Sequence, residues 1–225
     1  MTILPLQNQY IGFLTIWFNF VVKLEKDSEK LILKVAQKHF VSKGYVATRT
    51  QDIADDAGIN KALLHYYYRN KEKLYKAVIS KAFGEVMPIF ASAFASNGTF
   101  WDKIKKIINT YIDTLRSHPE LPIFIMTELS QNNVSLIEEL KKHSAIQPSI
   151  QQFLKDIETE VATGNIREIS SPQLVLNIIG MSVFPFMAKP IFTKLFEIPS
   201  EAFGALMEER KQTIYNFIRN AIEVK

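Results

Sequence analysis

The helical spacing of apolar residues constrains this chain most. From residue 27 to the C-terminus these residues recur every three or four positions, and no segment alternates apolar and polar residues over a strand's length. The pattern predicts an all-α fold, and 47% apolar residues among 225 suffice for a packed core. The predicted helices cover residues 28–43, 50–57, 61–68, 71 onward with a bend at Pro88, 101–117, 121–131, 134–161 with a break at Pro148, 173–187, 190–196 and 200–225.

The start of the chain differs from the rest. Residues 11–22 are almost unbroken apolar sequence, shorter than the roughly 20 residues of a membrane span and without the flanks of a secretory signal. We interpret residues 1–26 as a hydrophobic arm or as translated sequence upstream of the natural start, with a membrane anchor as the alternative. Asp27 or Ser28 is expected to cap the first helix of the body of the chain, and Gly44 to end it. The buried stripe expected on this helix is Leu31, Ile32, Val35, Ala36 and Phe40.

Charge is distributed unevenly along the chain. Residues 28–76 hold ten Lys and Arg against five Asp and Glu, a local +5, whereas residues 77–225 hold fifteen against sixteen. A local positive field suits a surface that faces phosphates. The charge pattern therefore points to residues 28–76 as the part that meets nucleic acid.

Several classes of protein are excluded by missing residues and motifs. The chain has no cysteine, so it holds no disulfide, thiol nucleophile or Cys-ligated zinc. It also lacks a phosphate-binding glycine loop and the common hydrolase motifs. We expect no cofactor and no catalytic residue, and an enzyme remains only as a minor alternative. No metal site is expected either, because metal-ligand spacing is absent from the four histidines, His39, His65, His118 and His143.

The sharpest motif is a pair of short helices within residues 50–66 joined by a tight turn at Gly58. Ala54 and Ala57 are small where the two helices must cross, and Leu64 can fill the space between them. This is helix-turn-helix spacing, in which the second helix enters the major groove of DNA.

Three residues acquire roles from that geometry. Lys61 would face base edges, and Thr50, at a helix N-terminus, could meet a phosphate. Lys71 would present its ammonium group to the DNA backbone.

The stretch TQDIADDAGINKALLHYYYRNKEKL, residues 50–74, resembles the head pattern of the TetR family (TetR/AcrR-like) of bacterial transcriptional regulators. The nine identical positions are Thr50, Ile53, Ala54, Ala57, Gly58, Leu64, Lys71, Glu72 and Leu74. The departures are Ala62 in place of Gly, His65 in place of Tyr, Tyr67 in place of His and Tyr68 in place of Phe. Tyr68 is expected in the core of the head. The DNA-binding positions implied by the resemblance are Thr50, Asn60, Lys61, Ala62, Leu63, His65, Tyr66, Tyr67 and Lys71.

The resemblance also implies an organisation and a function. A three-helix DNA-binding domain over residues 27–76 would be joined by a fourth helix to a helical ligand-binding and dimerisation domain over residues 77–225. Such a protein would be a cytoplasmic regulator, a repressor released from a palindromic operator in double-stranded DNA by a small hydrophobic or amphipathic effector. The alternatives are an activator of the same organisation, a membrane-tethered regulator that uses residues 11–22, and an all-α enzyme.

The larger domain offers candidates for the dimer and for the effector. The implied homodimer would form through about residues 173–187 and 200–223, and the first of these is apolar nearly all round, so both of its sides must be covered. The stripe expected to be buried on the last helix is Phe203, Leu206, Ile214, Phe217, Ile218 and Ala221. The residues that could line an effector cavity, and that would equally suit a plain core, are Tyr111, Phe124, Met126, Phe153, Phe184 and Met187.

Overall fold

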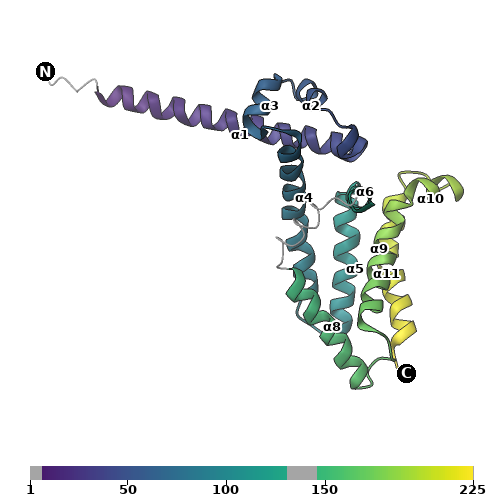
Figure 1. Cartoon of the computed structure of the whole chain (residues 1–225). Helices are drawn as coiled ribbons and strands as arrows, with labels where there is room; N and C mark the ends of the chain where they lie inside the picture. Colours follow the sequence, from purple (N-terminus) through teal and green to yellow (C-terminus); the bar gives the residue numbers. More distant parts are fainter. Residues whose placement is uncertain (1–6, 131–145, 225) are drawn as a thin grey trace. The chain divides into compact units, whose positions relative to one another are not determined.

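The computed structural model describes residues 7–130 and 146–224, and it describes side chains over residues 27–127 and 146–224. Within these ranges the regular secondary structure is helical apart from one isolated bridge between Ile166 and Glu223, which confirms the all-α prediction (Figure 1). The chain divides into two compact units, Met1–Val78 and Ile79–Lys225. The first is called the head below and the second the body.

The head contains three helices and the start of a fourth. These are α1 (Gln7–Ala47), α2 (Thr50–Asp56), α3 (Lys61–Tyr68) and the beginning of α4 (Lys71–Phe94). α2 packs against both α1 and α3. The side chains that form the core of the head, each almost fully buried, are Ile32, Ala36, Phe40, Ile53, Ala54, Leu64, Leu74 and Tyr75.

The predicted start of the first helix is wrong. α1 begins at Gln7 and runs through Asp27 and Ser28 without an end, because the intervening Lys, Leu and Glu residues favour helix and none breaks it. The prediction that Gly44 stops the helix is confirmed. Its backbone angles, φ 73° and ψ 172°, are not helical, so the long helix is interrupted there and only a short turn follows up to Ala47. A φ of that sign favours glycine.

The expected stripe of α1 also needs one correction. Ile32, Ala36 and Phe40 are buried at four-residue spacing, and Leu31, one position off this row, is 44% exposed. The structure describes no side chain in residues 1–26, so the hydrophobic arm, the upstream sequence and the membrane anchor stay predictions for this segment.

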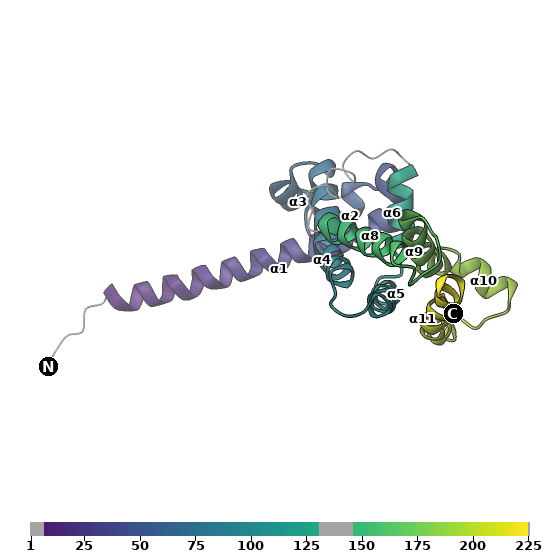
Figure 2. The same cartoon turned by 90° about the horizontal axis from the view of Figure 1, so that it is seen from below.

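The body is a bundle built around two central helices. α5 contacts α8, α9 and α11, and α9 contacts α5, α6, α8, α10 and α11. In both views α5, α9 and α11 run side by side (Figures 1 and 2). The helices of the body after α4 are α5 (Phe100–Ser117), α6 (Leu121–Ser130), α8 (Ile146–Ala162), α9 (Ser171–Met187), α10 (Lys189–Leu195) and α11 (Phe203–Ile222).

Aromatic rings form the centre of the body. The ring of Tyr111 stacks on that of Phe90 with 4.2 Å between centroids. Phe153 lies edge-on to Phe94 at 5.7 Å and stacks on Phe100 at 6.2 Å. α5 enters this core from a capping box, in which Thr99 and Asp102 satisfy each other's backbone N–H groups.

Two predicted boundaries in the body are displaced. α8 begins at Ile146 and includes Pro148, because proline is tolerated in the first turn of a helix. The rest of the helix predicted over residues 134–161 extends into residues 131–145, outside the described residues. α11 begins at Phe203, three positions after the predicted Ser200.

The buried stripe of α11 differs from the prediction. Leu206, Phe217 and Ala221, expected to be buried, are exposed in this single chain. They lie outside the row of α11 that faces α5 and α9, whose members are four or seven residues apart. That row consists of Phe203, Met207, Ile214, Ile218 and Ile222.

Membrane-spanning length and composition occur in one described helix. α4 has 24 residues, and 44% of its most apolar stretch is buried inside the protein, as in the core helix of a globular domain. α9 and α10 reach the same composition only as a pair bent by 66°.

Candidate nucleic-acid interface

The turn between α2 and α3 is fixed by backbone hydrogen bonds. The N–H of Ile59 donates to the carbonyl of Ala54 at 3.0 Å, and the N–H of Gly58 donates to that of Asp55 at 3.1 Å. These are the two bonds of a Schellman motif, with Gly58 at φ 64° in the position that favours glycine. The turn therefore ends α2 at a defined residue.

The next helix starts from a side-chain cap. Asn60 has extended backbone geometry, and its Oδ1 accepts a hydrogen bond from the N–H of Leu63 at 2.7 Å. Such a cap satisfies one of the orphan N–H groups at a helix start. The cap predicted at Asn60 is confirmed, and the amide nitrogen of Asn60 stays at the exposed end of α3.

α3 presents one face to the core and another outward. Leu64 and Tyr68 are buried one turn apart, which confirms the expectation that Tyr68 belongs to the core. Burial, followed by the nearby Glu29 carboxylate, raises the pKa of Tyr68.

The outward face gathers most of the residues implied to bind DNA. Lys61, Ala62, His65 and Tyr66 are exposed, and Tyr66 leaves 72% of its surface uncovered. Leu63 and Tyr67 flank this face and are half-buried. The Tyr66 and Tyr67 rings meet edge-on with centroids 5.4 Å apart. We call Lys61, Ala62, His65 and Tyr66 the outward face of α3.

Lys71 is held by contacts within the head. Its Nζ donates to the carbonyl of Val46 at 3.0 Å and lies 4.6 Å from the centroid of the Tyr45 ring. Burial lowers the pKa of Lys71. An ammonium group has three donors, so Lys71 ties the end of α1 to the start of α4 and can still donate elsewhere.

Two basic residues outside the sequence candidates lie beside the same elements. Arg49 is exposed at the N-cap of α2, whose first residue is the half-buried Thr50. Arg69 is exposed at the end of α3 with φ 56°. The local charge excess was the signal that could have singled them out.

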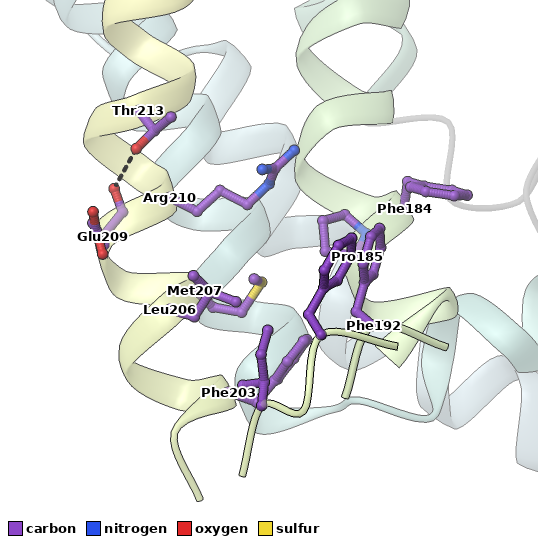
Figure 3. Close-up of a pocket in the computed structure, with 11 residues that line it drawn as sticks. Phe184, Pro185, Phe192, Phe203, Leu206, Met207, Glu209, Arg210 and Thr213 are labelled. Atoms are coloured by element: carbon purple, nitrogen blue, oxygen red, sulfur yellow. Dashed lines mark hydrogen bonds between the residues drawn. The ribbon is translucent and has the colours of Figure 1, made fainter. Parts of the chain in front are cut away.

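Two of the cavities found among the described residues of the body have mainly apolar walls. One, of about 80 Å³, lies between α4, α5, α6 and α9, and Tyr111 and Val86 line it. The other, of about 310 Å³, lies where α9, α10 and the start of α11 meet, with Phe184 and Arg210 in its wall (Figure 3).

The six effector candidates from the sequence are scattered over the body. Tyr111 lines the smaller cavity and Phe184 the larger one. Phe124 and Phe153 are buried core residues. Met126 is 49% exposed on α6, and Met187 is half-buried outside both cavities. Burial raises the pKa of Tyr111 to about 12, so its hydroxyl is neutral at ordinary pH.

Acidic and histidine side chains do not cluster in the described part of the chain. No three His, Asp or Glu side chains gather there at a metal-binding distance from one another.

Known proteins resemble both parts of the chain. A family model described as "Bacterial regulatory proteins, tetR family" matches residues 32–78, which hold α2 and α3. Over these residues the chain resembles the TetR family. The curated proteins that it resembles support a DNA-binding transcriptional regulator.

Two of these curated relatives illustrate the extent of the similarity. The uncharacterised HTH-type transcriptional regulator YhgD of Bacillus subtilis is 25% identical over 142 residues, 63% of this chain and 73% of YhgD. The HTH-type transcriptional regulator RutR of Escherichia coli K12 is 30% identical over 115 residues, 50% of this chain and 52% of RutR. The chain thus aligns with about half to three quarters of these relatives.

Solved structures share the fold of most of the chain. A TetR-family regulator from Marinobacter aquaeolei VT8 matches with a TM-score of 0.64 and 18% identity, covering 90% of this chain and 100% of that one. HlyIIR, a haemolysin II transcriptional regulator, matches at 0.59 and 22%, covering 84% and 97%. The TetR fold prediction is therefore confirmed beyond the motif.

TetR-family regulators bind DNA as soluble proteins, function as dimers with effectors, and are not normally enzymes. These relatives favour neither the membrane-tethered regulator nor the all-α enzyme. α3 is the second helix of the helix-turn-helix that lies within the residues matched by the family model.

Proposed function

We propose that this protein is a cytoplasmic, homodimeric repressor that leaves a palindromic operator in double-stranded DNA when a small apolar or amphipathic effector binds. The observation that carries the proposal is the outward face of α3, an exposed row on a helix whose opposite side is buried in the head. The turn at Gly58 and the cap at Asn60 fix the start of α3. A helix held at its start and bare along one side suits insertion into a major groove.

The proposed DNA contacts divide by distance along α3. Lys61, at the helix start, would donate to base edges, with Ala62 and Leu63 beside it. His65 and Tyr66 lie one turn further along the same face, where they would meet the groove wall. The residues proposed to hold phosphates are Thr50, Asn60, Tyr67 and Lys71. In this proposal residues 27–76 form the DNA-binding domain.

The proposed dimer uses the uncovered sides of α9 and α11. Leu176 is 61% exposed and Phe217 is 64% exposed, although both lie on helices that bury their other side in the body. A groove of about 120 Å³ runs between these helices and is lined in part by Asn177, Phe217 and Ala221. Apolar area of this kind gains stability when a second copy covers it. Two-fold pairing of the same face would produce a four-helix interface.

The proposed effector site is the smaller cavity, and α4 links it to the head in sequence. Lys71 begins α4, and Ala82, Val86 and Phe90 on the same helix line that cavity. An effector that binds better to a displaced α4 would favour the conformation that does not bind DNA. Coupling in such systems is typically about 1–3 kcal/mol, which lowers operator affinity by roughly 5- to 150-fold.

Selection of bound sequences from random duplex DNA by the purified full-length protein tests the proposal. We expect a two-fold symmetric consensus with half-sites about one turn, roughly 34 Å, apart. The matched variants are Phe217→Asp on the proposed dimer face and Phe196→Ser, which is also exposed but lies on the loop after α10. Phe217→Asp should yield monomers and lose operator binding, whereas Phe196→Ser should remain dimeric. An asymmetric consensus, or a dimeric Phe217→Asp, would contradict the proposed assembly.

A further inference from the structure

The cavity of about 310 Å³ in the body, where α9, α10 and the start of α11 meet, has a largely aromatic wall. Three of its four phenylalanine rings are in mutual contact: the Phe184 and Phe192 rings lie edge-on at 6.1 Å, and the Phe192 and Phe196 rings stack at 5.6 Å between centroids. Phe184 and Phe196 remain 57% and 60% exposed. Its volume of about 310 Å³ reaches the lower end of the range of about 300–1,000 Å³ for ligand pockets.

Arg210 enters this wall because of a proline in the facing helix. Pro185 lies inside α9 and has no N–H, so the carbonyl four residues earlier, that of Met181, has no helical donor. The Nε of Arg210 donates to that carbonyl at 2.9 Å. The bond fixes the guanidinium across the gap between α11 and α9 (Figure 3).

The rest of the guanidinium is unused within the described residues. Arginine has five N–H donors, and the four on the terminal nitrogens of Arg210 have no hydrogen bond or ion pair there. Burial lowers the pKa of Arg210, so its charge is partly removed from water. Glu209, the acidic residue in the cavity wall, is exposed and points to the opposite side of α11 (Figure 3). A half-buried cation without a counter-anion, beside uncovered aromatic rings, favours an anion with an apolar body.

We propose that this cavity binds a small organic carboxylate, its carboxylate paired with the two terminal nitrogens of Arg210 and its apolar body laid against Phe184, Phe192 and Phe196. Lys189 adds a second positive charge nearby, since its Nζ lies 4.9 Å from the centroid of the Phe203 ring in the same wall. This site shares no lining residue with the proposed effector cavity or with the groove on the proposed dimer face.

Calorimetric titration of the full-length protein with decanoate tests the site, with decyltrimethylammonium as the probe of equal chain length and opposite charge. We expect saturable binding of one decanoate per chain and much weaker binding of the cation. Arg210→Gln should weaken decanoate binding by roughly 10- to 100-fold, as expected for loss of hydrogen bonds to a charged group. Phe196→Ser, which leaves Arg210 in place, should weaken it by about tenfold through lost apolar contact.

Two control variants show whether decanoate binds in this cavity or elsewhere on the body. Arg167→Gln removes an exposed arginine of the same body and should bind decanoate as the unaltered protein does. Ala82→Leu fills the smaller cavity and should also leave decanoate affinity unchanged. Thermal unfolding of each variant checks that the body remains folded.

The proposal is overturned if Arg210→Gln binds decanoate as tightly as the unaltered protein, or if Ala82→Leu abolishes binding. It is equally overturned if Arg210→Gln and Phe196→Ser change only the concentration at which the protein dissociates into monomers, because the cavity would then be covered by a second copy. None of these results changes the consensus expected from the operator selection experiment, so the two proposals can fail separately.

Discussion

The cap of α3 offers a test in which helix stability and DNA binding can be separated. α3 has 8 residues, and Asn60 Oδ1 accepts from the N–H of Leu63 at 2.7 Å. Asn60→Ala removes this bond, and loss of such a cap costs about 1 kcal/mol. Because 1.4 kcal/mol corresponds to a factor of ten, the opening equilibrium of α3 should rise about fivefold.

Native-state hydrogen exchange of the backbone N–H groups of residues 65–68 measures that opening. We expect these groups to exchange about five times faster in Asn60→Ala. Asn60→Ser keeps an acceptor oxygen at the cap and should exchange within a few tenths of a kcal/mol of the unaltered protein.

Asn60→Asp separates the two roles of this position. Asp also caps, and its charge is favourable at a helix N-terminus by about 0.3–1 kcal/mol, so exchange should be unchanged or slower. The same charge would repel phosphates, so affinity for the selected operator should fall. Unaltered exchange in Asn60→Ala would refute the cap argument. Unaltered operator affinity in Asn60→Asp would contradict the proposal that the N-terminal end of α3 contacts DNA.

Four further outcomes are expected. Lys61→Ala should reduce discrimination at one operator base pair by about 1–3 kcal/mol; equal relative affinities across single-base operator variants would contradict a base contact. Lys71→Ala should weaken binding to all duplexes alike and flatten the slope of log affinity against log salt by about one unit, and an unaltered slope would exclude a phosphate contact. Because burial raises the pKa of Tyr111 to about 12, the unfolded chain ionises first. The free energy of unfolding of the body should therefore fall between about pH 10 and 12, and by on the order of 2 kcal/mol less in Tyr111→Phe, as measured in urea. Phe153→Ala should lower that free energy by about 3–5 kcal/mol, and a loss below 1 kcal/mol would contradict the packing described around this ring.

The head could be predicted closely because its determinants are local in sequence. Asn60 caps the helix that it precedes, and Gly58 adopts the φ that its own turn requires. Burial of Leu64 and Tyr68 follows from their four-residue spacing once the start of α3 is known. Each of these features depends on residues within one or two turns, so pattern and propensity agree with the structure.

Predictions failed where the result depends on which neighbour a helix meets. Leu206 and Phe217 are as apolar as the residues that α11 buries, and only the positions of α5 and α9 decide which row faces inward. The start of α1 was misplaced for a different reason. Asp27 and Ser28 are good N-caps, but an N-cap residue begins a helix only where the residues before it do not themselves continue as helix.

The bond between Arg210 and Met181 shows the same dependence at longer range. Sequence alone reveals that Pro185 leaves the Met181 carbonyl without a helical donor, yet the donor that satisfies it comes from 29 residues further along the chain. A buried carbonyl must be paired, so the need for a donor was predictable and the identity of that donor was not.

Lys71 presents the converse case. The motif predicts a cation for DNA, and the structure shows the same ammonium bound to Val46 and placed over Tyr45. A residue that matches a motif can therefore support the fold of the head and remain available to a phosphate. For that reason the salt slope of Lys71→Ala, which depends on phosphate contacts, is a better measure of its DNA contact than affinity alone, which the loss of the Val46 bond would also lower.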